Sequence, residues 1–359
     1  MKAIIVAGAV SFALALGLTP FAARFFLRRG LGQPIHKDMP MDHQVKQGTP
    51  TMGGSIVIAA VTLGYLAAHL FDRDLPSASG LLLLLLLVGL GGVGFLDDFL
   101  KITRARNLGL RGRTKLVGQA LIAVVFAILA TRLPDANGIS PGSTFVSFTR
   151  DLPSVQLGAV LFVLWALFMV SATSNGVNLI DGMDGLAAGS CTFVFAGYTI
   201  ICLWQSNHAC SVAQGAGCYH ARDPHDLAVI ALSVAAACGG FLWWNCYPAR
   251  IFLGDTGALA LGGALAGMAI MTRTELLLVV IGGLYVAANA SVILQRSYFK
   301  LTRRLTGTPR RIFLSSPLQF HYRLKGWSEV TVVVRFWIIS GIFVASGLCM
   351  FYAEWSTRS

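Results

Sequence analysis

Residues 80–98 read GLLLLLLLVGLGGVGFLDD, an apolar run that ends in the adjacent aspartates Asp97 and Asp98. A helix needs ~20 apolar residues to cross ~30 Å of hydrocarbon, so this stretch is long enough to span a membrane. An ionised carboxylate beside such a run is costly unless it meets water, a metal or a partner charge. The stretch therefore predicts a transmembrane helix with a polar site at its end.

The rest of the chain has the same character. Of its 359 residues, 55% are hydrophobic and only 12% are charged. Such a chain is too apolar for one soluble core, and the absence of strand-type alternation favours helices. We expect one all-α, membrane-embedded domain over residues 1–359. The ten candidate spans are 3–26, 51–71, 80–96, 116–133, 155–174, 183–204, 226–244, 257–272, 275–296 and 333–353.

The basic residues predict how these spans are oriented. One set of alternate loops carries 21 Lys and Arg residues and the other carries 7. The richer set is expected to be cytoplasmic, which places both termini outside. The formal net charge of +12 then belongs to the cytoplasmic face and suits anionic lipid heads or phosphate-bearing substrates. Nucleic acid is disfavoured because no nucleic-acid module is visible.

A second polar motif lies at 175–185, which reads NGVNLIDGMDG. Asn175, Asn178, Asp181 and Asp184 follow one another at intervals of three residues, which keeps them near one helical face. The glycines of the motif, Gly182 among them, let backbone amides approach a ligand closely. The structural alternative is a polar loop with turn glycines.

A third motif, FLGDTG at 252–257, precedes another apolar run. Asp255 is either an ordinary helix N-cap or a ligand of a metal that bridges a diphosphate at a helix N-terminus. Phe252 is either a core residue or a platform for a nucleic base. Lys46 and Lys115 are either membrane anchors or phosphate ligands.

Two loops leave alternatives open. His321 is the only histidine of the long loop before the last span, and it is either a bystander or a catalyst. Cys210 and Cys218 fall in the predicted outside loop 205–225, where an oxidising compartment permits a disulfide.

These motifs together resemble the polyprenyl-phosphate N-acetylhexosamine-1-phosphate transferases and, within them, the phospho-MurNAc-pentapeptide transferases. The resemblance extends along the whole chain and rests on the ten-span plan and five motifs, at 50–54, 94–98, 175–187, 244–245 and 252–257.

The resemblance implies an Mg²⁺-dependent enzyme of the bacterial cytoplasmic membrane. It implies transfer of phospho-MurNAc-pentapeptide from its UDP carrier to undecaprenyl phosphate, giving lipid I and UMP, and it suggests a homodimer. Matching positions place Asp97 and Asp98 at the lipid phosphate and Asp255, with Asp181, at the magnesium. The residues expected to bind the substrates are Lys46, Lys115, Asn175, Asn178, Asp181, Gly182, Asp184, Asn245, Phe252, Gln319 and His321.

The sequence departs from the family pattern in one loop and at two positions within predicted spans. A triple histidine is replaced by Gln319-Phe320-His321, and Ala288 and Ala258 replace a glutamate and a serine. These changes leave open a divergent paralogue that uses another donor such as UDP-GlcNAc, or one that tolerates nucleoside antibiotics.

An ion-coupled transporter is the rival class, because intramembrane acids and broken helices also mark carriers. Carrier sites belong near the bilayer midplane, whereas all five acids of the motifs are predicted at one membrane face. A catalytically silent scaffold does not explain five such acids. The enzyme is therefore the preferred interpretation.

Overall fold

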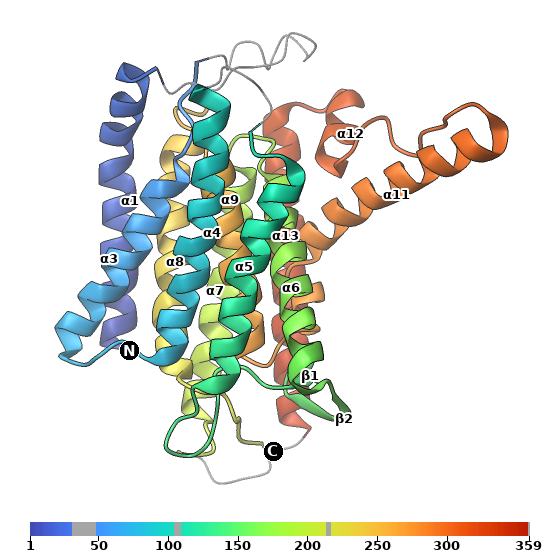
Figure 1. Cartoon of the computed structure of the whole chain (residues 1–359). Coiled ribbons are helices and arrows are strands. Elements are labelled where there is room, and N and C mark those ends of the chain that lie inside the picture. Colours follow the sequence, from blue (N-terminus) through green and yellow to red (C-terminus); the bar gives the residue numbers. More distant parts are fainter. Residues whose placement is uncertain (31–47, 104–108, 213–216, 358–359) are drawn as a thin grey trace.

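The computed structural model describes residues 1–30, 48–103, 109–212 and 217–357 (Figure 1). Its long helices run side by side in one bundle, as the apolar runs predict. The helices are α1 (Lys2–Arg28), α3 (Gly54–Asp72), α4 (Ala78–Thr103), α5 (Gly112–Arg132), α6 (Gly158–Ile180), α7 (Leu186–Asn207), α8 (Pro224–Asn245), α9 (Gly254–Met271), α10 (Leu277–Ile281), α11 (Gly283–Thr306), α12 (Leu318–Leu324) and α13 (Glu329–Ser356).

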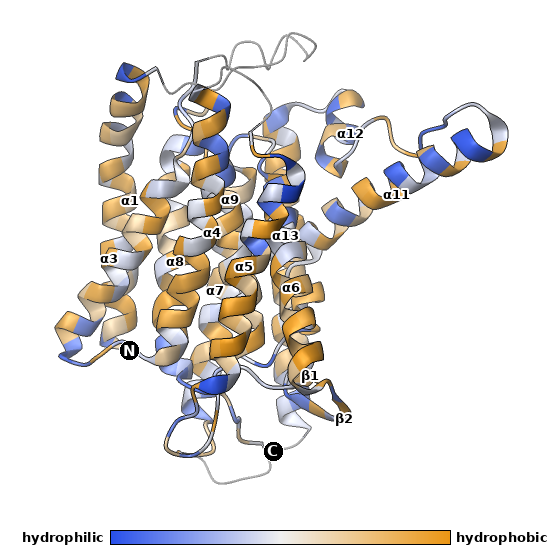
Figure 2. Ribbon diagram, viewed as in Figure 1, coloured by the Kyte–Doolittle hydropathy of each residue, from blue (hydrophilic) through white to orange (hydrophobic). Residues whose placement is uncertain are grey.

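Nine helices of the described residues are long and apolar enough to cross a membrane, namely α1, α3 to α9 and α13. Figure 2 shows apolar residues along the whole length of the bundle and polar residues gathered toward its two ends. The predicted all-α membrane fold is confirmed. The count of ten spans and the placement of the termini outside remain predictions.

The predicted span 275–296 is wrong as a single helix. The chain breaks at Gly282, between the short α10 and α11. Figure 1 shows α11 leaving the bundle obliquely and ending well outside it. The apolar run at 275–296 gives no sign of this break, because Gly282 and Gly283 also suit close helix packing.

Helix α9 lies at the centre, between α4 and α6. Almost all of its residues are buried, which agrees with a helix that is apolar on every side. Its N-terminus approaches α3 so closely that a Cβ on Gly54 would lie 2.0 Å from the Gly257 nitrogen. The motifs at 50–54 and 252–257 therefore meet at one end of the bundle.

The opposite end carries the features that the apolar runs did not predict. A short antiparallel hairpin joins β1 (Phe145–Ser147) to β2 (Asp151–Gln156), with Ser147 opposite Asp151. A disulfide joins Cys210 to Cys218 beyond the end of α7. Since α7 starts next to Asp184 and its 22 residues extend roughly 33 Å, this disulfide is remote from the aspartates.

Candidate active site

Three carboxylates from two helices meet at the end of the bundle. Asp97 and Asp98 lie in the last two turns of α4, and Asp255 lies in the first turn of α9. Their oxygens include a set in which all lie within 4.8 Å of one another. Residues separated by more than 150 positions thus form one acidic cluster, as the sequence predicted.

Two lysines balance this cluster. The Lys101 ammonium lies 2.6 Å from Asp97 Oδ2 and 2.7 Å from Asp255 Oδ2, so it bridges the two helices. The Lys115 ammonium, from α5, lies 2.9 Å from the same Asp255 oxygen. Ion pairs of this geometry offset part of the cost of burying the carboxylates, and they place two cations where an anionic substrate would bind.

Asp98 accepts hydrogen bonds from the first residues of α9. Its Oδ2 accepts hydrogen bonds from the backbone N–H of Thr256 at 2.9 Å and from the Thr256 hydroxyl at 2.7 Å. Its Oδ1 accepts from the Asp255 N–H at 3.3 Å. The first N–H groups of a helix lack partners within it, so Asp98 caps α9 from another helix and fixes the helix that carries Asp255.

Gly94 makes this arrangement possible. It lies one turn before Asp97 on α4, and a Cβ there would be 2.2 Å from the Asp255 carbonyl oxygen. The two helices touch backbone to backbone at this point. Any larger residue would separate Asp97 and Asp98 from Asp255.

The two asparagines of the 175–185 motif have different surroundings: Asn178 lies at the acidic cluster, and Asn175 lies in the interior of the bundle. The Asn178 side-chain amide donates a hydrogen bond to Asp255 Oδ1, which brings this residue into the acidic cluster. The Asn175 amide instead donates to the Ser171 carbonyl at 2.7 Å and to Gln119 at 3.3 Å. Asn175 therefore belongs to the seam between α5 and α6.

Asp181 and Asp184 lie in the turn that follows α6. Burial raises the pKa of Asp181, and the negative charge of Asp255 adds to this effect, while the backbone N–H of Gly254 donates to its carboxylate. The Asp184 carboxylate accepts from the Ala249 N–H at 3.0 Å. Asp184 thus ties this turn to the loop that precedes α9.

Helix α12 covers the same turn. The Gln319 amide donates to the Leu179 carbonyl at 2.6 Å, and a Cβ on Gly182 would lie 2.8 Å from the Phe320 ring. His321 Nδ1 accepts from the Leu314 N–H at 3.1 Å. The segment that replaces the family's triple histidine therefore packs directly on the Asp181 turn.

Two other predicted residues, Asn245 and Phe252, lie at the end of α8 and just before α9. The buried Asn245 amide donates to the Ile251 carbonyl at 2.9 Å, while its Oδ1 has no partner among the described residues. The backbone of Phe252 is held by Pro50 and Gly53 through hydrogen bonds of 2.8 and 2.9 Å. Lys46 lies outside the described residues.

The donor set suits a hard divalent cation. Carboxylate oxygens are the ligands that Mg²⁺ prefers, and the cluster offers them from Asp97, Asp98 and Asp255. Asp181, predicted as a metal ligand with Asp255, is not one of these three. It lies against Gly254, next to Asp255, and its role as a metal ligand stays a prediction.

The sequence interpretation did not include Lys101 or Thr256 among the site residues. The spacing of Lys101, three and four residues after Asp98 and Asp97, puts all three on neighbouring positions of one helix. That spacing is the signal that would have found Lys101. Thr256 had no comparable signal, because its partner comes from a distant helix.

Comparison with known proteins assigns the family. Residues 80–273 match the model of Glycosyl transferase family 4. The chain is 55% identical to the phospho-N-acetylmuramoyl-pentapeptide-transferase of Kineococcus radiotolerans, 53% to that of Pseudarthrobacter chlorophenolicus and 51% to that of Beutenbergia cavernae, each over 99% of both chains. The chain belongs to the phospho-N-acetylmuramoyl-pentapeptide-transferase family.

Proposed function

We propose that this chain transfers phospho-MurNAc-pentapeptide from UDP-MurNAc-pentapeptide to undecaprenyl phosphate, giving lipid I and UMP for peptidoglycan synthesis. Full-length similarity to transferases of that name supports the proposal. The observation that carries it is the cluster of Asp97, Asp98 and Asp255, bridged by Lys101 and Lys115, at one end of a membrane bundle.

The chemistry is a phosphoryl transfer between two anions. A phosphate oxygen of the lipid attacks the phosphorus that bears the sugar, and the bond from that phosphorus to UMP breaks, so UMP leaves with the electron pair. Such reactions demand alignment and neutralised charge above all. Lys101 and Lys115 supply fixed positive charge within reach of both substrates.

We assign Asp97 and Asp98 different roles because their contacts differ. The Asp98 oxygens accept the three hydrogen bonds from the start of α9, so we assign Asp98 a positioning role. Asp97 Oδ1 accepts a hydrogen bond from the Leu110 N–H at 2.7 Å, and its Oδ2 lies 2.6 Å from the Lys101 ammonium. Because Asp97 does not cap α9, we assign to it the acceptance of the proton of the lipid phosphate, whose second pKa is about 6.

We propose that Asp255, with the neighbouring carboxylates, holds Mg²⁺. When bound, the ion would offset the charge of the diphosphate. Asn178 orients the Asp255 carboxylate through its amide, and the buried Asn245 stays a predicted substrate-binding residue. Phe252 and Asp184 border the same approach.

We place the protein in the bacterial cytoplasmic membrane with this site facing the cytoplasm. The excess of basic residues in the loops at this end supports that orientation. The Cys210–Cys218 disulfide at the other end supports it independently, since disulfides persist in oxidising compartments. A homodimer remains a prediction of the family resemblance.

The decisive assay supplies purified protein with undecaprenyl phosphate, Mg²⁺ and one donor at a time, and measures UMP. UMP from UDP-MurNAc-pentapeptide alone supports the proposal. Release of UMP with UDP-GlcNAc alone would contradict the proposal. It would support the divergent-paralogue alternative, which rests on Gln319 and Phe320.

A further inference from the structure

The segment between Glu275 and Glu329 contains no acidic residue. It carries eight basic residues, at 296, 300, 303, 304, 310, 311, 323 and 325. It includes all of α11 and the chain that returns from it to α12. So strong an excess of one charge calls for an anionic partner beyond the segment itself.

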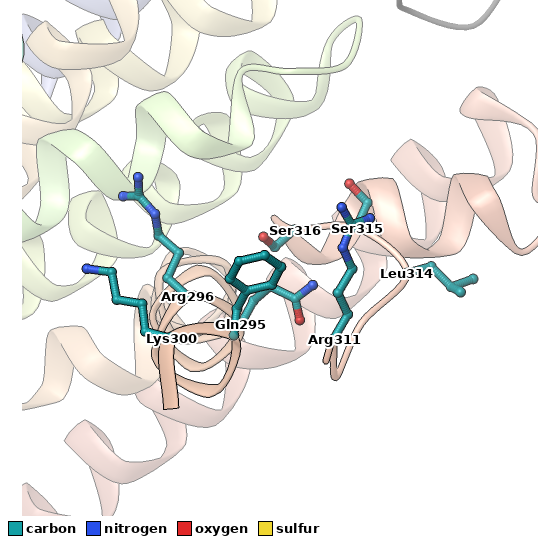
Figure 3. Close-up of a pocket in the computed structure, with 8 residues that line it drawn as sticks. Gln295, Arg296, Lys300, Arg311, Leu314, Ser315 and Ser316 are labelled. Atoms are coloured by element: carbon teal, nitrogen blue, oxygen red, sulfur yellow. The ribbon is translucent and has the colours of Figure 1, made fainter. Parts of the chain in front are cut away.

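A pocket forms where the returning chain folds back onto α11. It has a volume of about 360 Å³ and is lined by Gln295, Arg296, Phe299, Lys300, Arg311, Leu314, Ser315 and Ser316. Figure 3 shows Arg296 and Lys300 projecting from α11, with Arg311 on the returning chain near Ser315. Within the described part of the chain, these three cations have no carboxylate within ion-pair distance.

The pocket wall is fixed in place. The buried Gln295 side chain accepts hydrogen bonds from the Ile312 and Phe313 N–H groups, both at 3.0 Å, and donates to the Phe313 carbonyl at 2.9 Å. The Thr302 hydroxyl accepts from the Arg310 N–H at 2.9 Å. These bonds pin the returning chain to α11, so the pocket exists before a ligand arrives.

The surroundings of the pocket are apolar and exposed. Ile293, Leu301 and Leu305 are 63%, 52% and 74% exposed, and they recur along one side of α11. At 100° per residue this stripe lies next to the one formed by Arg296, Lys300 and Arg303. Adjoining apolar and basic stripes are typical of a helix that lies in a membrane interface.

The position of α11 agrees with that assignment. It leaves the bundle obliquely, so its outer half has no long helix of the bundle beside it (Figure 1). In Figure 2 its outer half carries hydrophilic residues between apolar ones. The exposed leucines beside the pocket cations would not help to bind a water-soluble peptide. A phospholipid would contact both groups, because its head is anionic and its acyl chains are apolar.

We propose that the pocket formed by Arg296, Lys300 and Arg311 binds the phosphodiester head of an anionic phospholipid, with the acyl chains along the Ile293–Leu305 side of α11. The three cations give the pocket a positive charge, and Ser315 and Ser316 offer hydroxyl donors to the phosphate oxygens.

The test counts lipids bound to delipidated protein by native mass spectrometry during titration with phosphatidylglycerol, phosphatidylcholine or inorganic phosphate. The triple variant Arg296→Gln, Lys300→Gln, Arg311→Gln is compared with Arg24→Gln, Arg28→Gln, Arg29→Gln. The control removes three exposed cations from the end of α1, at the same end of the bundle (Figure 1). Both variants change only exposed side chains.

We expect wild type and the α1 control to retain one phosphatidylglycerol that the pocket variant binds tenfold or more weakly, since each cation near a membrane surface attracts anionic lipid. Phosphatidylcholine and inorganic phosphate should not replace it. Equal binding by the pocket variant and wild type, or equal binding of the two phospholipids, would overturn the proposal.

Two further outcomes would reassign the pocket. Displacement of phosphatidylglycerol by equimolar undecaprenyl phosphate would make it an acceptor site. A higher KM for UDP-MurNAc-pentapeptide in the pocket variant, with phosphatidylglycerol binding unchanged, would make it a donor-peptide site. Either result contradicts a phospholipid site.

Discussion

Asp98 caps α9 through Thr256, accepting its backbone N–H at 2.9 Å and its hydroxyl at 2.7 Å on a single oxygen. A residue at the end of one transmembrane helix thus supplies the cap of another. Asp255, the next residue before Thr256, takes its position from that cap. Asp97 and Asp98 therefore differ in their contacts, and the roles proposed for them differ for that reason.

The first prediction concerns this cap. Asp98→Ala should lower the free energy of unfolding by about 1 to 2 kcal/mol, because it leaves two helix N–H groups without their acceptor. Asp98→Asn, which keeps one acceptor oxygen, should lose less. Thermal unfolding in detergent measures both, and an unchanged Tm for Asp98→Ala would refute the capping role.

The second prediction concerns the contact between α4 and α9. Gly94→Ala should destabilise the protein by about 1 to 3 kcal/mol and reduce UMP release, since its Cβ would meet the Asp255 carbonyl oxygen at 2.2 Å. Gly92→Ala is the matched control, because its Cβ would meet nothing within 4 Å. Equal behaviour of the two variants would show that the close contact does not matter.

The third prediction concerns Lys101. Lys101→Met removes the ammonium that bridges Asp97 and Asp255, so kcat for UMP release should fall about a hundredfold or more. Lys325→Met removes an exposed cation of α12's C-terminal end and serves as control. A Lys101→Met enzyme with the kcat of the control would exclude Lys101 from the reaction.

The fourth prediction concerns pH and the opposite end of the bundle. Glu275 lies in the turn after α9, and burial raises its pKa to about 7 although it accepts two hydrogen bonds from Ser147. The folded state therefore holds a proton that the unfolded state releases near pH 4.5. Stability should fall as pH rises from about 4.5 to about 7.

Glu275→Gln provides the comparison for that slope. The amide cannot ionise, so the variant's Tm should depend less on pH across this window than the Tm of wild type. Identical slopes for the two proteins would show that Glu275 does not titrate there.

The fifth prediction concerns the altered histidine segment. Gln319 and Phe320 pack on the end of α6 and on the turn that carries Asp181, a residue predicted to bind the substrate, so replacing them should alter that turn. Wild type should bind uridine-based inhibitors more weakly than the double variant Gln319→His, Phe320→His. Equal inhibitor potency would end the antibiotic-tolerance alternative.

The sequence predicted the gathering of Asp97, Asp98 and Asp255, because each follows or precedes an apolar run of known length and therefore lies at a definable membrane face. It could not predict that Asn175 bonds to Gln119, since both asparagines of the motif fit one helical face equally well. The direction in which each turns depends on helix packing, which spacing alone does not encode.

The α10–α11 break was missed for a related reason. Hydropathy measures how apolar residues 275–296 are, and they are apolar enough for a span. The break at Gly282 depends on how α11 packs against α6 and α13, and such contacts are tertiary. The same limit applies to Thr256, whose partner Asp98 is 158 residues away.

The central claim is that the carboxylate of Asp255 is required for the phosphoryl transfer, because it would hold the Mg²⁺ that offsets the charge of the diphosphate. Its most direct test is UMP release by Asp255→Asn and wild type at saturating undecaprenyl phosphate, UDP-MurNAc-pentapeptide and Mg²⁺, with Tm measured on both proteins. We predict that kcat falls about a thousandfold while the protein remains folded. A folded Asp255→Asn protein that releases UMP at the wild-type rate would contradict the account.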